Sequence, residues 1–364
     1  MSRVQETEAP TQDLSTLWIL QGQRSNQYRE VAMTRIALDA MGGDRAPETI
    51  VQGLAEAIGD RQFRAFLIGD EKKIGKSLKR HGVDRSVELV HASEVVGPGE
   101  SPSMAVRKRQ NSSIGVGVRM QKEGKVDAFV SAGSTGAVMA FSLLTLGRLK
   151  GVNRPAIAAF FPTKEGFSLV LDVGANSDCK PLNLLQFALM GSIYLSYSFR
   201  KQSPRVALLS MGEEDSKGND LTLAAHDLLR SADLINFVGN IEASRILDGV
   251  ADVIVCDGFV GNSVLKFGES IIDYVSESVK ESVRGGFKAK LGGLMLKSSF
   301  KKMIKRMNYE EYGGAPLLGI DGAVFACHGK STSRAIRSAL ISTCNYVEGR
   351  VNEHIREELA TLTR

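Results

Sequence analysis

The sequence predicts an α/β protein in which helices cover both faces of a largely parallel sheet. Short apolar runs of strand length recur along the chain, and a glycine-containing polar loop and an apolar pattern at helical spacing follow each of them. The clearest instance covers residues 167–191, where an apolar run ends at Val173, a turn-forming segment follows, and a helical pattern begins at Leu184. This alternation is typical of parallel strands joined by helical crossovers.

The other elements follow the same order along the chain. The expected strands are residues 35–40, 63–68, 87–91, 126–131, 157–161, 168–172, 206–210, 235–238 and 253–256. Further helical patterns begin at Pro47 and Ala137, and another is expected as one helix over 103–121. The strands 157–161 and 168–172 are predicted to form a hairpin, which would be an antiparallel insertion in an otherwise parallel sheet.

The length and composition of the chain limit the classes of protein to which it can belong. With 364 residues, 43% of them hydrophobic and 24% charged, the chain can bury a sizeable core. Its cysteines, Cys179, Cys256, Cys327 and Cys344, are far apart and lack metal-ligand spacing, so we expect buried thiols in a reducing compartment and no metal site. The sequence contains no pattern of signal-peptide type and no apolar run of about 18 residues. A cytoplasmic protein is therefore expected.

Residues 1–32 show little periodicity and are interpreted as a flexible amino-terminal extension. No linker composition marks a domain boundary near Gly151. Residues 33–364 are therefore predicted to form a single α/β domain, from which helices protrude at about residues 264–310.

Positive charge is concentrated in this protruding segment. Residues 282–309 contain eight basic and no acidic side chains, and subtracting these from the net charge of +5 leaves −3 on the rest. This distribution favours a local docking surface over a generally cationic, nucleic-acid-binding protein. Two helices are expected, over 264–291 and 297–307, and the first carries an apolar stripe that includes Val264, Phe267 and Ile271.

The second of these helices is predicted to lie on an anionic membrane surface, with apolar and basic side chains on opposite faces. The expected contacts are Phe300, Lys301, Lys302, Ile304, Lys305 and Arg306. The alternative is that the apolar face completes the core, which periodicity by itself favours.

Three familiar sequence motifs are matched only in part. The segment from Gly115 lacks the third glycine of a dinucleotide fingerprint, and the sequence before Lys330 has Val324 where a phosphate loop needs its first glycine. The segment 133–136 is one residue short of a nucleophile elbow, in which glycines stand two residues before and two residues after the serine. No cofactor is therefore expected, and neither ATP hydrolysis nor serine-ester chemistry is favoured.

A set of polar residues stands at the ends of the expected strands. The set is Asp39, Ser134, Thr135, Asn176, Asp178, Lys180, Asn240, Asp257, Asn262 and His328. Each residue by itself is more often a turn former or a helix cap. Because the carboxyl ends of parallel strands share one edge of a sheet, we expect these residues to converge on one site.

Several long segments together resemble the bacterial phosphate acyltransferase family. They are IALDAMGGDRAPETIVQG (36–53), SAGSTGAVMA (131–140), LDVGANSDCKPLNLLQFALMGS (171–192), GNIEASRIL (239–247), VCDGFVGNSVLK (255–266) and GGAPLLGIDGAVFACHGKS (313–331). The resemblance covers about residues 34–350, in order. One departure is Asp321, where asparagine is expected from the family, and its carboxylate is expected to point away from an anion site.

The resemblance implies a Rossmann-like α/β/α sandwich with a mostly parallel sheet, related to isopropylmalate-type dehydrogenases and phosphotransacetylases. It also implies transfer of a long-chain acyl group from acyl carrier protein to inorganic phosphate, which forms acyl phosphate for phospholipid synthesis. The implied partners are acyl carrier protein, a second copy in a homodimer, and a downstream glycerol-3-phosphate acyltransferase at the inner face of the membrane.

Phosphate itself is the nucleophile in this reaction, so the protein must hold the phosphate and stabilise the oxyanion. Main-chain amides at 133–136 and 174–176, together with Lys180, are the expected phosphate ligands, and Lys180 is the foremost catalytic candidate. Asn240 or His328 is expected to donate to the oxyanion, or His328 to protonate the departing thiolate. The remaining expected binding residues are Asp39, Gly43, Ser134, Thr135, Asn176, Asp178, Asp257 and Asn262.

Two other functions remain open at this point. A phosphotransacetylase acting on a coenzyme A thioester would share the fold and the reaction class. A noncatalytic membrane scaffold would leave the polar strand ends unexplained. For the carrier protein, Arg107, Lys108 and Arg109 form one candidate docking surface, although solvated helix charges are the default interpretation.

Overall fold

The computed structural model describes residues 33–83, 87–97, 99–284, 286, 291–292, 294–300 and 313–362. Its strands are β1 (Arg35–Asp39), β2 (Arg64–Gly69), β3 (Val87–His91), β4 (Ala128–Ser131), β5 (Ala156–Thr163), β6 (Gly166–Leu171), β7 (Arg205–Leu209), β8 (Asn236–Ile241), β9 (Val253–Val255), β10 (Ala315–Leu318) and β11 (Ala323–Ala326). They form one 11-stranded sheet in the order β3-β2-β1-β4-β11-β10-β5-β6-β9-β7-β8.

Both faces of the sheet are buried, as the uniformly apolar strands predict. Side chains alternate along each strand, so Ile36 and Leu38 of β1 belong to one apolar cluster and Ala37 belongs to the other. The cluster of Ile36 also contains buried residues of α2 (Glu48–Asp60), α3 (Glu71–His81), α7 (Pro181–Phe199), α8 (Asp220–Arg230), α11 (Ser333–Glu348) and α12 (Val351–Leu362). The other cluster contains residues of α4 (Pro102–Lys108), α5 (Ser113–Lys122), α6 (Thr135–Thr145), α9 (Gly258–Arg284) and the 3₁₀ helix η1 (Ala243–Asp248). The predicted α/β/α sandwich is confirmed.

The direction of the strands reverses in the middle of the sheet. Strands β1, β2, β3, β4 and β11 are mutually parallel, and β6, β9, β7 and β8 are also mutually parallel. Between these halves, β11 pairs antiparallel with β10, β10 with β5, and β5 with β6. Three successive antiparallel pairings leave β6 running opposite to β4. The carboxyl ends of the two parallel halves therefore lie at opposite edges of the sheet.

The hairpin of β5 and β6 is confirmed, with Ala158 opposite Leu171. Its companion, the antiparallel pair β10 and β11, is missing from the sequence prediction. Each of these two strands has four residues, and Gly319 and Gly322 flank the connection between them. Runs this short give no period to detect.

The helix expected over 103–121 is two helices. Arg109 has non-helical angles of φ −119° and ψ 43°, which ends α4. Ser112 then caps α5, because its hydroxyl accepts a hydrogen bond from the N–H of Gly115 at 3.2 Å and donates to the carbonyl of Arg109 at 2.6 Å. The serine pair 112–113 is the helix-start signal that the periodicity alone conceals.

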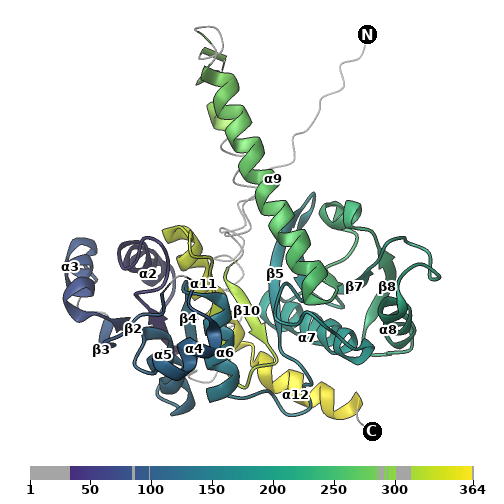
Figure 1. Ribbon diagram of the computed structural model, residues 1–364, viewed down its shortest axis with the longest axis horizontal. Helices are drawn as coiled ribbons and strands as arrows, with labels where there is room; N and C mark the ends of the chain where they lie inside the picture. The colour runs from purple at the N-terminus through teal and green to yellow at the C-terminus, as the bar shows by residue number, and fades with distance from the viewer. Residues whose placement is uncertain are drawn as a thin grey trace, which may run out of the picture. The chain divides into compact units, whose positions relative to one another are not determined.

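Helix α9 extends away from the sheet (Figure 1), and the long side chains of Phe267 and Tyr274 are exposed. It begins six residues before the predicted start, at Gly258, and it ends at Arg284 rather than at 291. Gly286, just beyond it, has φ 144°. Residues 294–300 are helical, so part of the second predicted helix is observed. Of the expected membrane contacts, Phe300 is described, whereas Lys301, Lys302, Ile304, Lys305 and Arg306 lie outside the described residues.

The predicted division at residue 32 stays a prediction. Residues 34–364 cluster as one compact unit, with no division near Gly151. Within the part of the chain that the structure describes, no helix is both long and apolar enough to cross a membrane.

Candidate active site

The polar loops at one edge of the sheet form what we call the first loop cluster, residues 39–45, 131–136 and 327–332. Asp39 stands at the end of β1 and is 1% exposed. Its carboxylate accepts hydrogen bonds from the N–H groups of Met41 and Gly42 at 2.9 and 3.1 Å and from the hydroxyl of Ser131 at 2.7 Å. Burial raises the pKa of Asp39, and the hydrogen bonds from Ser113 and Ser131 oppose this shift. Asp39 is therefore a positioning residue, and its burial corrects the expectation that it contacts phosphate.

The three loops pack backbone against backbone. A Cβ atom at Gly42 would lie 2.5 Å from the nitrogen of Gly133, so no side chain fits there. Gly43 has φ 98°, and its neighbour Asp44 donates its N–H to the carbonyl of Gly329 at 2.8 Å. Gly43, expected to bind substrate, thus brings the loop after β1 against the loop after β11.

The amino terminus of α6 opens into this cluster. The hydroxyl of Ser134 caps the helix by accepting the N–H of Ala137 at 3.4 Å, and the N–H of Gly133 is bound to Ser131 at 3.0 Å. Within the described residues, the N–H groups of Ser134, Thr135 and Gly136 have no hydrogen-bond partner. Thr135 and Gly136 are exposed. Open amides at the positive end of a helix are a site for an anion.

Cationic and donor side chains are present in the other loops of the first loop cluster. His328 follows β11 and is half-buried, and its Nδ1 accepts the N–H of Lys330 at 3.2 Å. This hydrogen bond leaves the proton of the neutral ring on Nε2, where it can be donated. Lys330 is exposed, and the guanidinium of Arg45 reaches the carbonyl of Ser331 at 3.4 Å. The arrangement suits an anionic substrate beside a hydrogen-bond donor.

The loops at the opposite edge form the second loop cluster, residues 172–180 and 256–262. Its centre is Asp172, which is fully buried. The carboxylate accepts N–H groups from Ile157 at 3.0 Å, Gly174 at 3.2 Å, Ala175 at 3.0 Å and Asn176 at 2.7 Å. Burial raises the pKa of Asp172, and these hydrogen bonds counteract the rise.

The amides expected to cradle phosphate at 174–176 are therefore already bound to a carboxylate. The side chain of Asn176 is also engaged, because its Nδ2 donates to Pro155 at 2.7 Å and to Asp172 at 2.9 Å. The start of α9 is similarly closed, since Asp257 accepts the N–H groups of Phe259 and Val260 at 2.9 Å. Asn176 and Asp257 thus hold loops and helices rather than an open anion site.

The remaining predicted residues of this cluster lie at its surface. Lys180 and Asp178 are exposed, and Asn262 lies against Gly174, where an added Cβ atom would be 3.6 Å from the Asn262 side chain. Burial and the nearby charge of Asp172 raise the pKa of the Cys179 thiol to about 11. Cys179 is thus protonated at neutral pH, which fits the expectation of an inert thiol.

Asn240 belongs to neither cluster. It lies within β8, the terminal strand of the sheet, rather than in the loop where the sequence placed it. Its side chain is committed on both sides: Nδ2 donates to the carbonyl of Glu214 at 2.9 Å, and Oδ1 bonds Nδ1 of His226 at 3.0 Å. One N–H of Nδ2 has no hydrogen-bond partner among the described residues, but Asn240 lies on the terminal strand β8, so its expected oxyanion role stays a prediction.

The predicted convergence on one edge is wrong, because the strand direction reverses between β4 and β6. Asp39, Gly43, Ser134, Thr135 and His328 lie at one edge, and Asn176, Asp178, Lys180, Asp257 and Asn262 lie at the other. Strands β1 and β6 are five spacings apart in the sheet order, which amounts to roughly 24 Å at about 4.8 Å per spacing. The two clusters are therefore separate in the strand order of the sheet.

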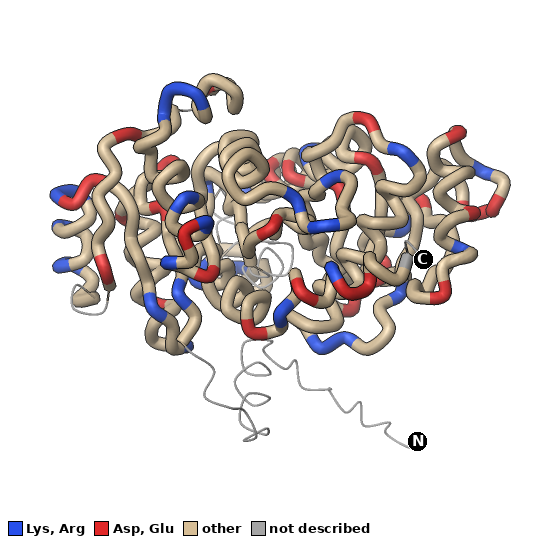
Figure 2. The backbone as a smooth tube through the Cα atoms, turned by 90° about the horizontal axis from the view of Figure 1, so that it is seen from below, with Lys and Arg blue, Asp and Glu red and all other residues tan. Residues whose placement is uncertain are grey.

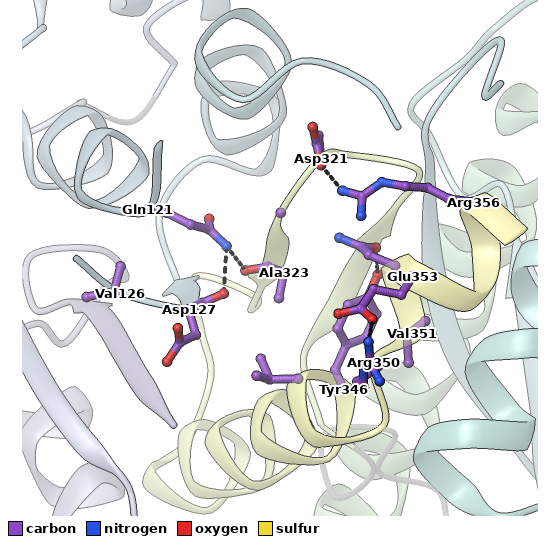
Figure 3. A pocket seen from close by; sticks show the side chains of 13 residues that line it. Gln121, Val126, Asp127, Asp321, Ala323, Tyr346, Arg350, Val351, Glu353 and Arg356 are labelled. Carbon is purple, nitrogen blue, oxygen red and sulfur yellow. Dashed lines mark hydrogen bonds and ion pairs between the residues drawn. The ribbon is translucent and has the colours of Figure 1, made fainter. Parts of the chain in front are cut away.

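Figure 3 shows a pocket of about 290 Å³ at the amino ends of β4 and β11. Because the first loop cluster follows the carboxyl ends of these parallel strands, the pocket lies at the opposite edge of the sheet. Its charged side chains neutralise one another, since Asp321 pairs with Arg356 and Arg350 pairs with Glu353. This pairing confirms that Asp321 points away from the first loop cluster. The pocket offers no set of unpaired donors for an anion.

Sequence reasoning missed Asp172, Ser131, Arg45 and Lys330. Asp172 lies in the apolar run that ends at Val173, so it was interpreted only as the last residue of the expected strand 168–172. A repeated pattern was available as a signal, because Asp39 and Asp172 both end an apolar run and precede a glycine-containing loop. Lys330 was considered only within a failed phosphate-loop motif.

Comparison with known proteins identifies a family model and relatives that match most of the chain. A family model described as fatty acid synthesis protein matches residues 34–354. A phosphate acyltransferase of Heliobacterium modesticaldum is 52% identical over 308 residues, covering 84% of this chain and 92% of that protein. Another, of Pelotomaculum thermopropionicum, is 46% identical over 328 residues and covers 90% and 96%. The EutD phosphotransacetylase of Staphylococcus aureus shares the fold, with a TM-score of 0.59, 18% identity and coverage of 92% and 98%.

Phosphate binding by the unpartnered N–H groups at the start of α6 can be tested by substitution. We expect Thr135→Pro to weaken the binding of inorganic phosphate roughly 10- to 100-fold, because a hydrogen bond to a charged group contributes about 1.5–3 kcal/mol. Proline is tolerated at the first position of a helix, and Ser134 before it already has φ −57° and ψ 115°, which suits a residue preceding proline. Isothermal titration with phosphate measures the dissociation constant.

Thr135→Val is the matched control, since it removes the hydroxyl and keeps the amide. If Thr135→Pro binds phosphate as the natural protein does while Lys180→Met loses binding, phosphate lies at the second loop cluster instead.

Proposed function

The chain belongs to the phosphate acyltransferase family, and on that premise we propose that it transfers a long-chain acyl group from acyl carrier protein to inorganic phosphate. The product is an acyl phosphate, a mixed anhydride that a glycerol-3-phosphate acyltransferase would consume in phospholipid synthesis. The observation that carries this proposal at the level of the site is the open amino terminus of α6 in the first loop cluster, whose other loops carry Arg45, His328 and Lys330.

Phosphate bound at these amides acts as the nucleophile. One phosphate oxygen forms a bond to the thioester carbonyl carbon, and the carbonyl oxygen becomes a transient oxyanion. When the oxyanion collapses, the carbon–sulfur bond breaks and the carrier leaves as a thiolate, which takes a proton. The Nε2–H of His328 is suited either to donate a hydrogen bond to the oxyanion or to protonate the thiolate.

No side chain of the protein needs to form an acyl intermediate. Burial raises the pKa of Cys256 well above its usual value, and that of Cys179 to about 11, so neither thiol is ionised at neutral pH. The hydroxyl of Ser134 is occupied as a helix cap. These observations support direct attack by phosphate held in place, for which positioning contributes much of the acceleration.

The α4 helix lies beside the proposed reaction site. A Cβ atom at Gly136 would be 2.9 Å from the side chain of Pro102, so the start of α4 packs against the start of α6. Arg107 and Lys108 are exposed on α4, and their expected role in docking the carrier protein stays a prediction. Arg109 is a correction to the expected surface, because it pairs with Glu100 at 3.3 Å and Glu94 at 3.8 Å.

The test follows thiol release from acyl-[acyl carrier protein] with and without phosphate, and traps acyl phosphate with hydroxylamine. We expect phosphate-dependent release in the natural protein and a decrease in kcat of about 100-fold or more in His328→Gln, since a positioned proton donor contributes about 10²–10⁴-fold. Ser333→Ala, a nearby substitution on α11, is the control.

Equal release without phosphate would make the protein a thioesterase and contradict the proposal. Faster reaction with acyl-coenzyme A than with the carrier thioester would favour a phosphotransacetylase. An unchanged kcat in His328→Gln would remove this histidine from the mechanism.

We propose that the protein forms a homodimer through α9. Exposed and half-buried apolar side chains recur along this helix at alternating spacings of four and three, the pattern of a helix that packs against another helix. They are Val260, Val264, Phe267, Ile271 and Tyr274. Phe267 is 68% exposed and Tyr274 is 71% exposed, which is unusual for side chains of this size.

Phe267→Lys is expected to shift the protein from dimer to monomer in sedimentation velocity, because a charge in the middle of an apolar seam must be desolvated to associate. Asp273→Lys, on the same helix but outside the seam, should leave the dimer intact. A Phe267→Lys protein that sediments like the natural one would exclude this seam as the interface.

We also propose that the segment beyond α9 contacts the membrane surface. Leu294, Met295 and Leu296 are 67%, 76% and 52% exposed, and Lys297 follows them. Exposed apolar side chains next to basic ones suit an anionic lipid interface. Lys301, Lys302, Lys305 and Arg306 continue the basic segment in the sequence.

Replacement of Lys301, Lys302, Lys305 and Arg306 by glutamine should reduce sedimentation with anionic vesicles, since each basic side chain near such a surface contributes about 1 kcal/mol. Leu294→Ser combined with Met295→Ser should reduce it further. The control is Leu144→Ser combined with Met211→Ser, because these side chains are 70% and 76% exposed elsewhere. Equal binding to neutral and anionic vesicles would contradict the proposal.

A further inference from the structure

Helix α3 presents a row of basic side chains that the proposed mechanism does not use. Its sequence is EKKIGKSLKRH, and its cationic residues all lie on the exposed face. They are Lys72, Lys73, Lys76, Lys79 and Arg80. Figure 2 shows lysines and arginines along this outer end of the molecule, where β3 is the terminal strand.

Most of these charges are not neutralised. Arg80 pairs with Glu48 at 2.7 Å, and this pair, with help from Ser77 and His81, lowers the pKa of Glu48 to about 2. Lys73 is 4.0 Å from Asp70. Within the described residues, Lys72, Lys76 and Lys79 have no ion pair. Glu88 on neighbouring β3 is already paired with Arg64 at 3.1 Å.

Stability of the helix does not account for this pattern. Lysines near a helix carboxyl terminus interact favourably with the helix dipole, but lysines in the first turn interact unfavourably. Lys72 and Lys73 occupy the first turn, and their N–H groups are held at 3.0 and 3.2 Å by the cap Asp70. Two cations are therefore present where the helix itself favours anions.

The face is also rigid and fixed in place. Ile74 and Leu78 are buried against the core on the inner side of α3, and Gly82 closes the helix with φ 69°. Packing against α2 and the bond from Ser77 to Glu48 at 2.8 Å hold its position. Because the backbone of α3 is already fixed, only its side chains lose conformational freedom when a partner binds.

One end of this helix adjoins the proposed reaction site. Strand β2 ends at Gly69, directly before α3, at the same edge of the sheet as the first loop cluster. A Cβ atom at Gly69 would lie 2.5 Å from Cγ of Met41, which belongs to the loop after β1. Because α3 has 11 residues, all of it lies within about 16 Å of that end. A carrier bound there would be near the site.

We propose that the exposed face of α3, defined by Lys72, Lys73, Lys76, Lys79 and Arg80, docks the acyl carrier protein through an acidic surface of that protein. This inference rests on the proposed function and adds where its protein substrate binds. A lipid surface fits this face poorly, because both large apolar side chains of α3, Ile74 and Leu78, are buried and none remains to enter the lipid. Complementary charge is what a transient protein contact uses to accelerate encounter.

The test variant is Lys72→Glu combined with Lys76→Glu. The first change favours the helix dipole, so the helix is expected to fold, and an unchanged Tm verifies this. The control is Lys122→Glu combined with Lys150→Glu, which makes the same change in net charge at exposed positions near the opposite sheet edge. We measure steady-state kinetics with acyl-[acyl carrier protein] and, separately, binding of labelled carrier protein without an acyl chain by fluorescence anisotropy.

For the α3 variant we expect the KM for the carrier thioester and the Kd for the free carrier to rise about tenfold or more, from the loss and reversal of contacts that steer association. The KM for phosphate and the kcat at saturating carrier should not change. In the natural protein, added salt should weaken carrier binding, and the variant should show a smaller salt dependence.

The possible failures are distinguishable. If the natural protein shows no phosphate-dependent thiol release, the proposed function is wrong. If the natural protein is active and the α3 variant keeps its KM and Kd, the docking proposal is wrong. It is also overturned if the control variant weakens carrier binding equally, or if the α3 variant loses only its binding to anionic vesicles.

Discussion

The reversal of strand direction at β10 and β5 is the constraint on which the arrangement of this protein depends. Three adjacent antiparallel pairings turn one half of the sheet against the other. Parallel strands bring their loops to the edge at which they end, so each half presents its polar loops at a different edge. A sheet parallel throughout would have placed all of these loops at one edge. Here the repeated order of strand, polar loop and helix produces two separate loop clusters.

The two clusters differ in how their backbone donors are used. Both are built on a buried carboxylate at a strand end, but Asp172 accepts the N–H groups of three consecutive loop residues, whereas Asp39 accepts two and leaves the neighbouring start of α6 open. An amide bound to an internal carboxylate is not available to a substrate anion. This competition for donors distinguishes a loop whose N–H groups are open from a loop whose N–H groups hold its own shape, and residue types alone do not reveal the difference.

The sequence predicted those features that depend on short-range pattern. Uniform apolar runs indicated strands buried on both faces, and the hairpin of β5 and β6 followed from two such runs around a short turn. The pairings of the four-residue strands β10 and β11 depend on contacts with β5 and β4, which are distant in sequence, and no local pattern encodes them. Without knowledge of these pairings, the reversal of strand direction cannot be recognised from the sequence. That is why Lys180 and His328 were expected at one edge.

The second loop cluster supports the first turn of α9. A Cβ atom at Gly261 would lie 1.9 Å from the carbonyl oxygen of Asp172, and one at Gly258 would lie 2.6 Å from its carboxylate. The first turn of α9 therefore rests directly on the loop that Asp172 holds, and only glycine permits this approach. With 27 residues, α9 is about 40 Å long, so a tilt of about 10° at its base would move its far end by roughly 7 Å. A contact at the far end of so long a helix is placed reproducibly only if its base is rigid. The hydrogen bonds from the loop amides of residues 174–176 to the buried carboxylate of Asp172 supply that rigidity at the base of α9.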